Sequence, residues 1–148
     1  MKVLVCGGAG YIGSHMVRRL ERDCVETVVF DNLSTGHREA VGESAFVIGD
    51  LLDPTQLRDL SAQHRFDAVM HFCARSLVGE SVQQPYAYYE NNVTGTLNLL
   101  RAMHQADVGK LVFSSTAAVF GHPESELIDE SHPTPPINPY GAGKRKVQ

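Results

Sequence analysis

The sequence contains no tryptophan, only three cysteines, and no apolar run close to the roughly 20 residues that a bilayer-spanning helix needs. It also has no excess of positive charge, because 13 Lys and Arg residues face 17 Asp and Glu residues and give a net charge of −4. The missing apolar run excludes a transmembrane helix, and the missing basic surface argues against nucleic-acid binding. We therefore expect no membrane and no nucleic acid among the partners of the chain.

The three cysteines, Cys6, Cys24 and Cys73, are odd in number and lack metal-ligand spacing. They indicate reduced thiols or small core residues, and the first residues lack the pattern of a signal peptide. We expect a cytoplasmic location and no metal. The 148 residues, 43% of them hydrophobic and 20% charged, have the size and composition of one globular domain.

Short apolar runs rich in Val and Phe alternate with stretches of helical periodicity. This alternation is typical of a parallel sheet covered by helices on both faces, and it predicts an α/β fold. The predicted strands are residues 2–6, 26–30, 45–48, 68–72 and 110–113. Both faces of such strands are expected to be buried.

Three complete helices are expected between these strands. Ile12, Met16 and Leu20 follow the spacing of a helix that packs on a sheet. Asp53 and the proline after it predict the start of a short helix that runs to about residue 60. A longer helix is expected at about residues 86–106. Its predicted apolar side carries Tyr89, Val93, Leu97 and Leu100.

Five prolines predict a long irregular loop over residues 122–139, and loops of this length are often functional. Another helix is expected from Tyr140, but the sequence stops at Gln148, barely two turns later. We therefore expect the α/β fold formed by these residues to be incomplete.

Gly7, Gly10 and Gly13 follow the first strand with the spacing G-x-x-G-x-x-G and open the first helix. Glycines of this kind permit a tight strand-to-helix turn that approaches a pyrophosphate closely, while the helix N-terminus attracts its charge. A glycine-rich turn that binds no ligand is the alternative interpretation.

Asp31 ends the second strand, close to the roughly 20 residues after the glycines at which an acid binds the adenosine ribose. Its negative charge would repel a 2′-phosphate, so we expect NAD rather than NADP. Asp50 ends the third strand, where an adenine would lie. The alternatives are that Asp31 is a turn residue before Asn32, and that Asp50 or Asp53 caps the following helix.

Thr116 follows the fifth strand at the edge where α/β sheets bind ligands. Tyr140 and Lys144 stand one turn apart on the last predicted helix. A tyrosine works as a base at neutral pH only where a nearby positive charge stabilises its phenolate, and a lysine one turn away supplies such a charge. A Tyr/Lys pair on a solvated helix face is the inert alternative, so the prediction depends on the glycines upstream.

These residues resemble the extended short-chain dehydrogenase/reductases, and among them the 4-epimerases that act on nucleotide sugars. The resemblance covers the chain from Lys2 to Gln148. Its motifs are residues 5–15, 30–34, 71–74, 78–81, 89–93 and 138–141, together with Lys144.

The resemblance implies a Rossmann-like, doubly wound parallel sheet with strand order 3-2-1-4-5. Residues 1–148 would form an NAD-binding domain that is truncated before the remaining strands and the substrate-binding half. The implied activity interconverts UDP-glucose and UDP-galactose by transient oxidation at carbon 4, with NAD as the cofactor. A homodimer is one possible assembly.

The resemblance also assigns roles to positions. It implies that Tyr140, Lys144 and Thr116 are catalytic, with Tyr140 and Lys144 also touching the cofactor. The other implied cofactor contacts are Gly7, Gly10, Tyr11, Ile12, Gly13, Asp31, Asn32, Leu33, Ser34, Thr35, Gly36, Asp50, Leu51, Phe72, Cys73, Ala74, Ser76 and Asn91. For three of these a structural interpretation competes, because Phe72 and Ala74 could be core residues and Asn91 an exposed helix residue.

The sequence departs from neighbouring members at Ala117 and Ala118, where the nucleotide-sugar dehydratases carry an acid pair. Elimination is therefore not expected. The chain is also about half as long as family members, so we expect the chain alone to turn over poorly. A catalytically inactive NAD-binding module and an epimerase for another nucleotide sugar remain the alternatives.

Overall fold

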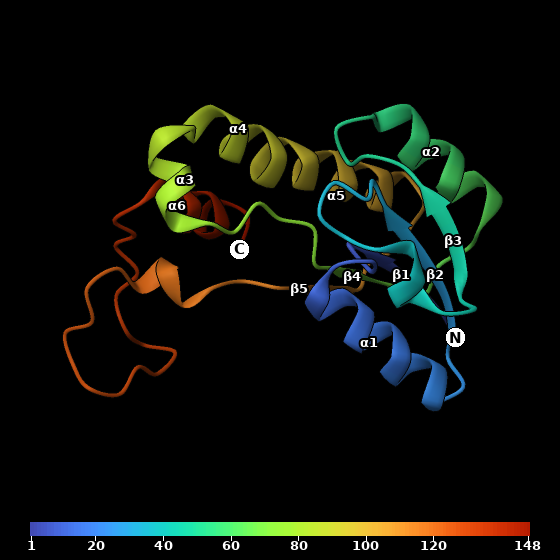
Figure 1. Ribbon diagram of the computed structural model, residues 1–148, viewed down its shortest axis with the longest axis horizontal. Helices are drawn as coiled ribbons and strands as arrows, with labels where there is room; N and C mark the ends of the chain where they lie inside the picture. The colour runs from blue at the N-terminus through green and yellow to red at the C-terminus, as the bar shows by residue number, and fades with distance from the viewer. The chain divides into compact units, whose positions relative to one another are not determined.

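The computed structural model describes all 148 residues, which form two compact units. The first, which we call the sheet unit, comprises residues 1–74 and 98–114. The second, which we call the helical unit, comprises residues 75–97 and 115–148. Figure 1 shows the elements of each unit along the chain.

The sheet unit contains five parallel strands in the order β3-β2-β1-β4-β5. Their bounds are β1 Lys2–Cys6, β2 Glu26–Asp31, β3 Ala45–Ile48, β4 Ala68–His71 and β5 Leu111–Phe113. Cys6 is in register with Phe30 of β2 on one side and with His71 of β4 on the other. The predicted α/β class and strand order are thus confirmed, and the direction of the winding reverses at β1.

Helices cover both faces of this sheet, with α1 on one side and α2 and α5 on the other (Figure 1). Their bounds are α1 Tyr11–Arg22, α2 Pro54–Gln63 and α5 Gly95–Gln105, and a 3-10 turn, η1, covers Arg38–Val41. Val3 and Val5 pack with Val17 of α1, whereas Leu4 and Cys6 pack with Leu57 and Leu99. The alternation along β1 therefore fills two separate hydrophobic layers.

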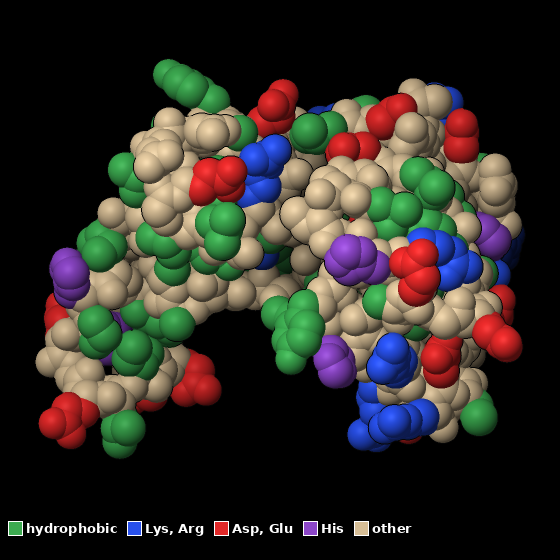
Figure 2. All heavy atoms as spheres, in the orientation of Figure 1, with side chains coloured by type: hydrophobic (Ala, Val, Ile, Leu, Met, Phe, Trp, Pro, Cys, Tyr) green, Lys and Arg blue, Asp and Glu red, His purple; other side chains and the backbone are tan.

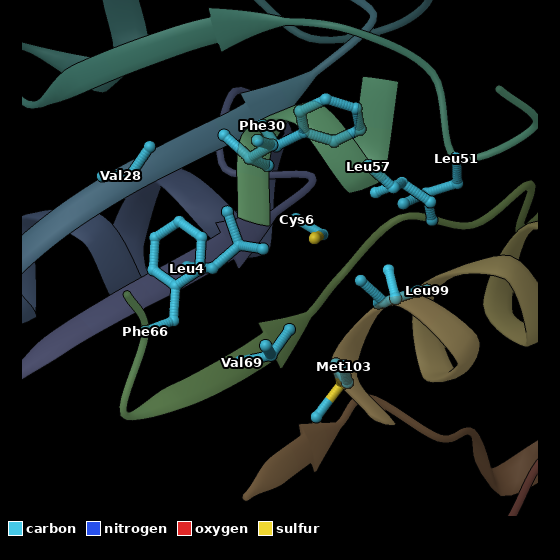
Figure 3. Packing of buried hydrophobic residues seen from close by; sticks show 12 residues of the cluster. Leu4, Cys6, Val28, Phe30, Leu51, Leu57, Phe66, Val69, Leu99 and Met103 are labelled. Carbon is cyan, nitrogen blue, oxygen red and sulfur yellow. The ribbon is translucent and has the colours of Figure 1, made fainter. Parts of the chain in front are cut away.

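The second of these layers is drawn in Figure 3, where side chains from the strands, α2 and α5 converge. Cys6 is fully buried there, and this burial raises the pKa of its thiol, with the charge of Asp31 adding to the effect. On the outer surface, basic side chains gather over the C-terminal end of α1 (Figure 2). Arg19 and Arg22 of its last turn complement the negative end of the helix dipole.

The predicted apolar stripe of α1 was wrong at its first position. Ile12 is 58% exposed, whereas Gly13, Val17 and Leu20 are buried. The helix faces the sheet along the Gly13–Val17 row, since glycine at the first turn allows the helix and the preceding strand to approach closely.

The long helix predicted at 86–106 is one continuous helical stretch with a π turn in its middle. It consists of α4 (Pro85–Tyr89), the π turn η2 (Glu90–Thr94) and α5. Its buried side carries Tyr88, Asn92, Thr96 and Leu99, one position before each predicted residue. Leu97 is 50% exposed, so its predicted burial was wrong. The prediction searched for apolar residues at helical spacing. Because Asn92 and Thr96 on the buried side are polar, it assigned burial to the adjacent side of the helix instead.

The helical unit contains α3 (Val78–Gln83), α4, the π turn η2, a 3-10 turn η3 (Ala117–Phe120) and α6 (Pro139–Lys146). The sequence did not predict α3, which has only six residues. The loop over 121–138 has no helix or strand, as its prolines predicted. No helix in either unit combines the length and hydropathy needed to cross a bilayer.

Replacing Leu57 with alanine should lower the free energy of unfolding by about 2–5 kcal/mol, because its fully buried side chain would leave a cavity beneath α2. Urea denaturation of the variant measures this loss. Ile48→Ala in the same unit is the matched control, since its side chain is 69% exposed and should cost no more than about 1 kcal/mol. Equal losses in the two variants would contradict the assigned core.

Candidate functional site

The glycine turn joins β1 to α1 through a backbone geometry that other residues do not tolerate. Gly7 has a φ of +79°, in the left-handed region, and its N–H donates to the carbonyl oxygen of Phe30 at 2.9 Å. A Cβ at Gly13 would overlap the carbonyl oxygen of Gly7. The predicted glycines therefore hold two backbone segments in direct contact.

The first turn of α1 is open to a ligand. Its N-cap, Gly10, makes no side-chain cap hydrogen bond, and the first turn contains no acid. Tyr11 is 83% exposed and Ile12 is exposed beside it. The N–H groups and the positive dipole end thus face no capping side chain, and phosphate binding at this position stays a prediction.

Asp31 lies at the end of β2, buried to 7% exposure, with both carboxylate oxygens engaged. Oδ2 accepts from the backbone N–H of Ala9 at 3.0 Å, and Oδ1 accepts from that of Leu33 at 2.8 Å. An ionised carboxylate has about four acceptor positions, so each oxygen keeps room for a hydroxyl donor. Asp31 is therefore both a turn residue and a fixed acceptor beside the glycine turn.

The segment after Asp31 is tied to the same turn. Leu33 adopts a φ of 57°, and the N–H of His37 donates to the carbonyl oxygen of Ala9 at 3.0 Å. A Cβ at Gly36 would lie 2.7 Å from the carbonyl carbon of Ala9, so this position too requires glycine. Ser34 and Thr35 between them are exposed, as cofactor contacts need to be.

Asp50 follows β3 and is linked to the β2 end by Asn32, whose side-chain amide donates to Asp50 Oδ2 at 2.9 Å. Of the two cap candidates, Asp53 caps α2, because its Oδ1 accepts from the N–H groups of Thr55 and Gln56. Asp50 is left at the sheet edge. Leu51 is buried in the core, so only its backbone could border a ligand.

Residues 72–74 leave β4 next to the glycine turn. A Cβ at Gly7 would lie 2.6 Å from the backbone nitrogen of Cys73, so the two segments touch. Phe72 and Cys73 are half-buried and pack against the two hydrophobic layers. The core interpretation thus holds for the Phe72 side chain, while Ala74 is also half-buried and Ser76 is exposed.

The helical unit holds the three predicted catalytic residues. Tyr140 and Lys144 lie one turn apart on α6, with 9% and 3% exposure. This burial rules out the interpretation of a solvated Tyr/Lys face. Thr116 is half-buried, and its Oγ1 accepts from the N–H of Ala118 at 3.2 Å, which leaves its hydroxyl proton to donate elsewhere.

Packing explains a glycine that weakens α6 as a helix. A Cβ at Gly141 would overlap the carbonyl oxygen of Ala118 in η3, so glycine is required where the two elements meet. Asn138 caps the helix by accepting from the N–H of Gly141 at 2.8 Å, and Pro139 occupies the first turn. The sequence around Tyr140 therefore fixes the start of α6 and its contact with η3.

Asn91 is half-buried, so the interpretation as an exposed helix residue is wrong. Its side-chain amide donates to Asn92 Oδ1 at 2.8 Å. Sequence reasoning missed Asn92 itself and Tyr88, both buried in the helical unit. The sequence places Tyr88 and Asn92 four positions apart, on the same side of a helix. Because both residues are polar, this spacing does not distinguish a buried pair from an exposed one.

Comparison with known proteins finds a matching family model and relatives with similar sequences. A family model described as the NAD dependent epimerase/dehydratase family matches residues 3–148. A UDP-glucose 4-epimerase of Halalkalibacterium halodurans is 51% identical over 148 residues, which is all of this chain and 44% of that relative. A putative UDP-arabinose 4-epimerase of Arabidopsis thaliana is 45% identical over 99% of this chain and 36% of its own length.

Solved structures agree with the fold. The crystal structure of UDP-glucose 4-epimerase from Brucella ovis in complex with NAD superposes with a TM-score of 0.96 at 45% identity, over 99% of this chain and 45% of that one. The chain therefore spans less than half the length of these relatives. The match over nearly all of its residues confirms the resemblance seen in the sequence: the chain belongs to the NAD dependent epimerase/dehydratase family.

Proposed function

We propose that the chain is the cofactor-binding part of a 4-epimerase that interconverts UDP-glucose and UDP-galactose. The observation that carries this proposal is the pair of hydrogen bonds that fixes Asp31 beside the glycine turn. The relatives named UDP-glucose 4-epimerase support the substrate pair. The proposal treats residues 1–148 as a single NAD-binding domain in function, with most contacts to the nucleotide sugar supplied by other residues.

The residues of the sheet unit fit NAD. A Cβ at Gly10 would meet only the carbonyl oxygen of Gly7, at 3.4 Å, so the turn has room for a ligand at this position. The first turn of α1 offers its N–H groups to a pyrophosphate, and Asp31 offers acceptors to ribose hydroxyls. The fixed negative charge of Asp31 disfavours a 2′-phosphate and so selects NAD over NADP. When bound, NAD supplies a reversible hydride acceptor for the oxidation at carbon 4.

The residues of the helical unit fit a proton transfer. Tyr140 would take the proton of the sugar 4-hydroxyl and later return it. The ammonium of Lys144, one turn away, would stabilise the phenolate form of Tyr140 that accepts this proton, and Thr116 would donate to the sugar oxygen. Ala117 and Ala118 carry no acid, so the chain lacks the groups for a subsequent elimination.

A second substrate is favoured by one specific observation, the 45% identity with a relative named as a putative UDP-arabinose 4-epimerase. Both sugars would be oxidised at carbon 4, and the same three side chains would serve either reaction. An inactive NAD-binding module is the alternative function, in which the sheet unit binds NAD and the helical unit catalyses nothing.

A homodimer and a cytoplasmic location are also part of the proposal. Light scattering on the purified protein tests the homodimer.

NAD should raise the Tm of the chain more than NADP does. At about 100 times its Kd, a ligand that binds only the folded state stabilises it by about 2.7 kcal/mol. Asp31→Asn should remove the preference, because the amide lacks the negative charge that disfavours the 2′-phosphate. Differential scanning fluorimetry checks this, with the exposed Asp129→Asn as the control. Equal stabilisation by NAD and NADP in the unsubstituted chain would contradict the assignment.

Tyr140→Phe should lower kcat of the epimerase that carries this sequence by about 10²–10⁴-fold, because the ring stays while the proton acceptor is lost. The conversion of UDP-galactose, coupled to a UDP-glucose dehydrogenase, measures it. Tyr86→Phe is the matched control, since Tyr86 is 87% exposed in the same unit and should leave kcat unchanged. A Tyr140→Phe enzyme with full activity would show that the base lies elsewhere.

A further inference from the structure

Two buried polar residues of the helical unit take no part in the chemistry proposed above. Tyr88 of α4 and Asn92 of the π turn η2 lie at i, i+4 and are 1% and 2% exposed. A buried amide and a buried phenol are costly unless they are hydrogen-bonded. Their partners therefore indicate what these two positions hold in place.

Asn92 pairs with both backbone groups of Arg75. Its Oδ1 accepts from the N–H of Arg75 at 2.9 Å, and its Nδ2 donates to the carbonyl oxygen of Arg75 at 2.9 Å. This is the pattern by which one strand residue pairs with another. The side chain of Asn92 thus takes the place of a neighbouring strand for a segment that belongs to no sheet.

Tyr88 pairs in the same way two residues further along. Its hydroxyl accepts from the N–H of Leu77 at 3.0 Å and lies 2.8 Å from the carbonyl oxygen of Leu77 and 2.6 Å from Glu80 Oε2, the two acceptors for its single proton. Burial raises the pKa of Tyr88, and the hydrogen bond to Glu80 adds to this. The phenol therefore keeps the proton that it donates.

The two side chains together fix the residue between their partners. Arg75 and Leu77 are alternate positions, and Leu77 has the extended φ and ψ of −84° and 105°. Because both of its chain neighbours are hydrogen-bonded through their backbone, the residue between them is held in place. That residue is the exposed Ser76, one of the predicted cofactor contacts.

Tyr88 also contacts the predicted base. Its ring packs edge-on against the ring of Tyr140, with centroids 6.4 Å apart and planes at 79°. One side chain therefore joins the 75–77 segment to α6 within the helical unit. The π turn that carries Asn92 is of the kind that is frequent at functional sites.

We propose that Tyr88 and Asn92 form a clamp, a pair of positioning residues that holds Ser76 in place for the cofactor and supports the ring of Tyr140. This inference rests on the proposed function, because Ser76 and Tyr140 have their roles there. The clamp itself acts through backbone hydrogen bonds and touches no reacting atom.

The test uses Tyr88→Phe, which removes one oxygen atom, and Asn92→Leu, which keeps the size of the side chain and removes both bonds. Hydrogen exchange should be faster at the amides of Arg75 and Leu77 and unchanged in α2. The Kd for NAD, measured by isothermal titration calorimetry, should rise by about two- to tenfold in each variant, the equivalent of one hydrogen bond. Thr94→Ala, an exposed position in the same π turn, is the control for both readouts.

A double variant separates positioning from general stability. Ser76→Ala should raise the Kd for NAD in the unsubstituted chain but add little in the Asn92→Leu background, since both changes would remove the same contact. Additive effects, or faster exchange with an unchanged Kd, would overturn the clamp. If Asn92→Leu does not fold, Tyr88→Phe in the same cycle decides the matter. An unsubstituted chain that binds no NAD would instead refute the proposed function.

Discussion

The contact between backbone segments at the glycine turn is the constraint on which the rest of the sheet unit depends. Gly13 lies against the carbonyl of Gly7, and Gly7 lies against the backbone of Cys73. Side chains at these positions would force the start of α1 away from β1 and β4. The close approach places the N–H of Ala9 within 3.0 Å of Asp31, and so the acid and the open helix end are set by the same turn.

The charge of Asp31 is tolerated near the core because two backbone N–H groups compensate it. Its neighbour Cys6 responds in the expected direction, with a thiol whose pKa is raised by burial and by that charge. A neutral thiol fits the hydrophobic layer below, while the carboxylate stays at the edge of the sheet. Asn32 then connects this edge to Asp50, so that the ends of β2 and β3 behave as one polar surface.

The sequence predicted the sheet well for a physical reason. Apolar runs rich in Val and Phe mark the strands, and each predicted strand agreed with the structure to within about one residue. The expected burial of both faces was wrong for β3 and β5, where Ile48 is 69% and Val112 is 51% exposed, because these two strands form the edges of the sheet. In the candidate site, the backbone geometry was predictable where a motif requires glycine, as at Gly7 and Gly13. The side that α4 and α5 bury was not, because Asn92 and Thr96 are polar and satisfied by hydrogen bonds that periodicity does not detect.

The helical unit contains no sheet, so hydrogen bonds from side chains to the backbone have a larger part in ordering it. Its irregular segments are held by side chains that bond to backbone: Asn92 to Arg75, Tyr88 to Leu77, and Asn138 to Gly141. Such bonds depend on direction, whereas hydrophobic burial tolerates small shifts. In the proposed reaction Tyr140 would meet a single sugar hydroxyl, and a base in that role requires such directionality. Of the residues that hydrophobic patterns missed, Tyr88 packs against the ring of Tyr140 and thereby links this bonding to the proposed base.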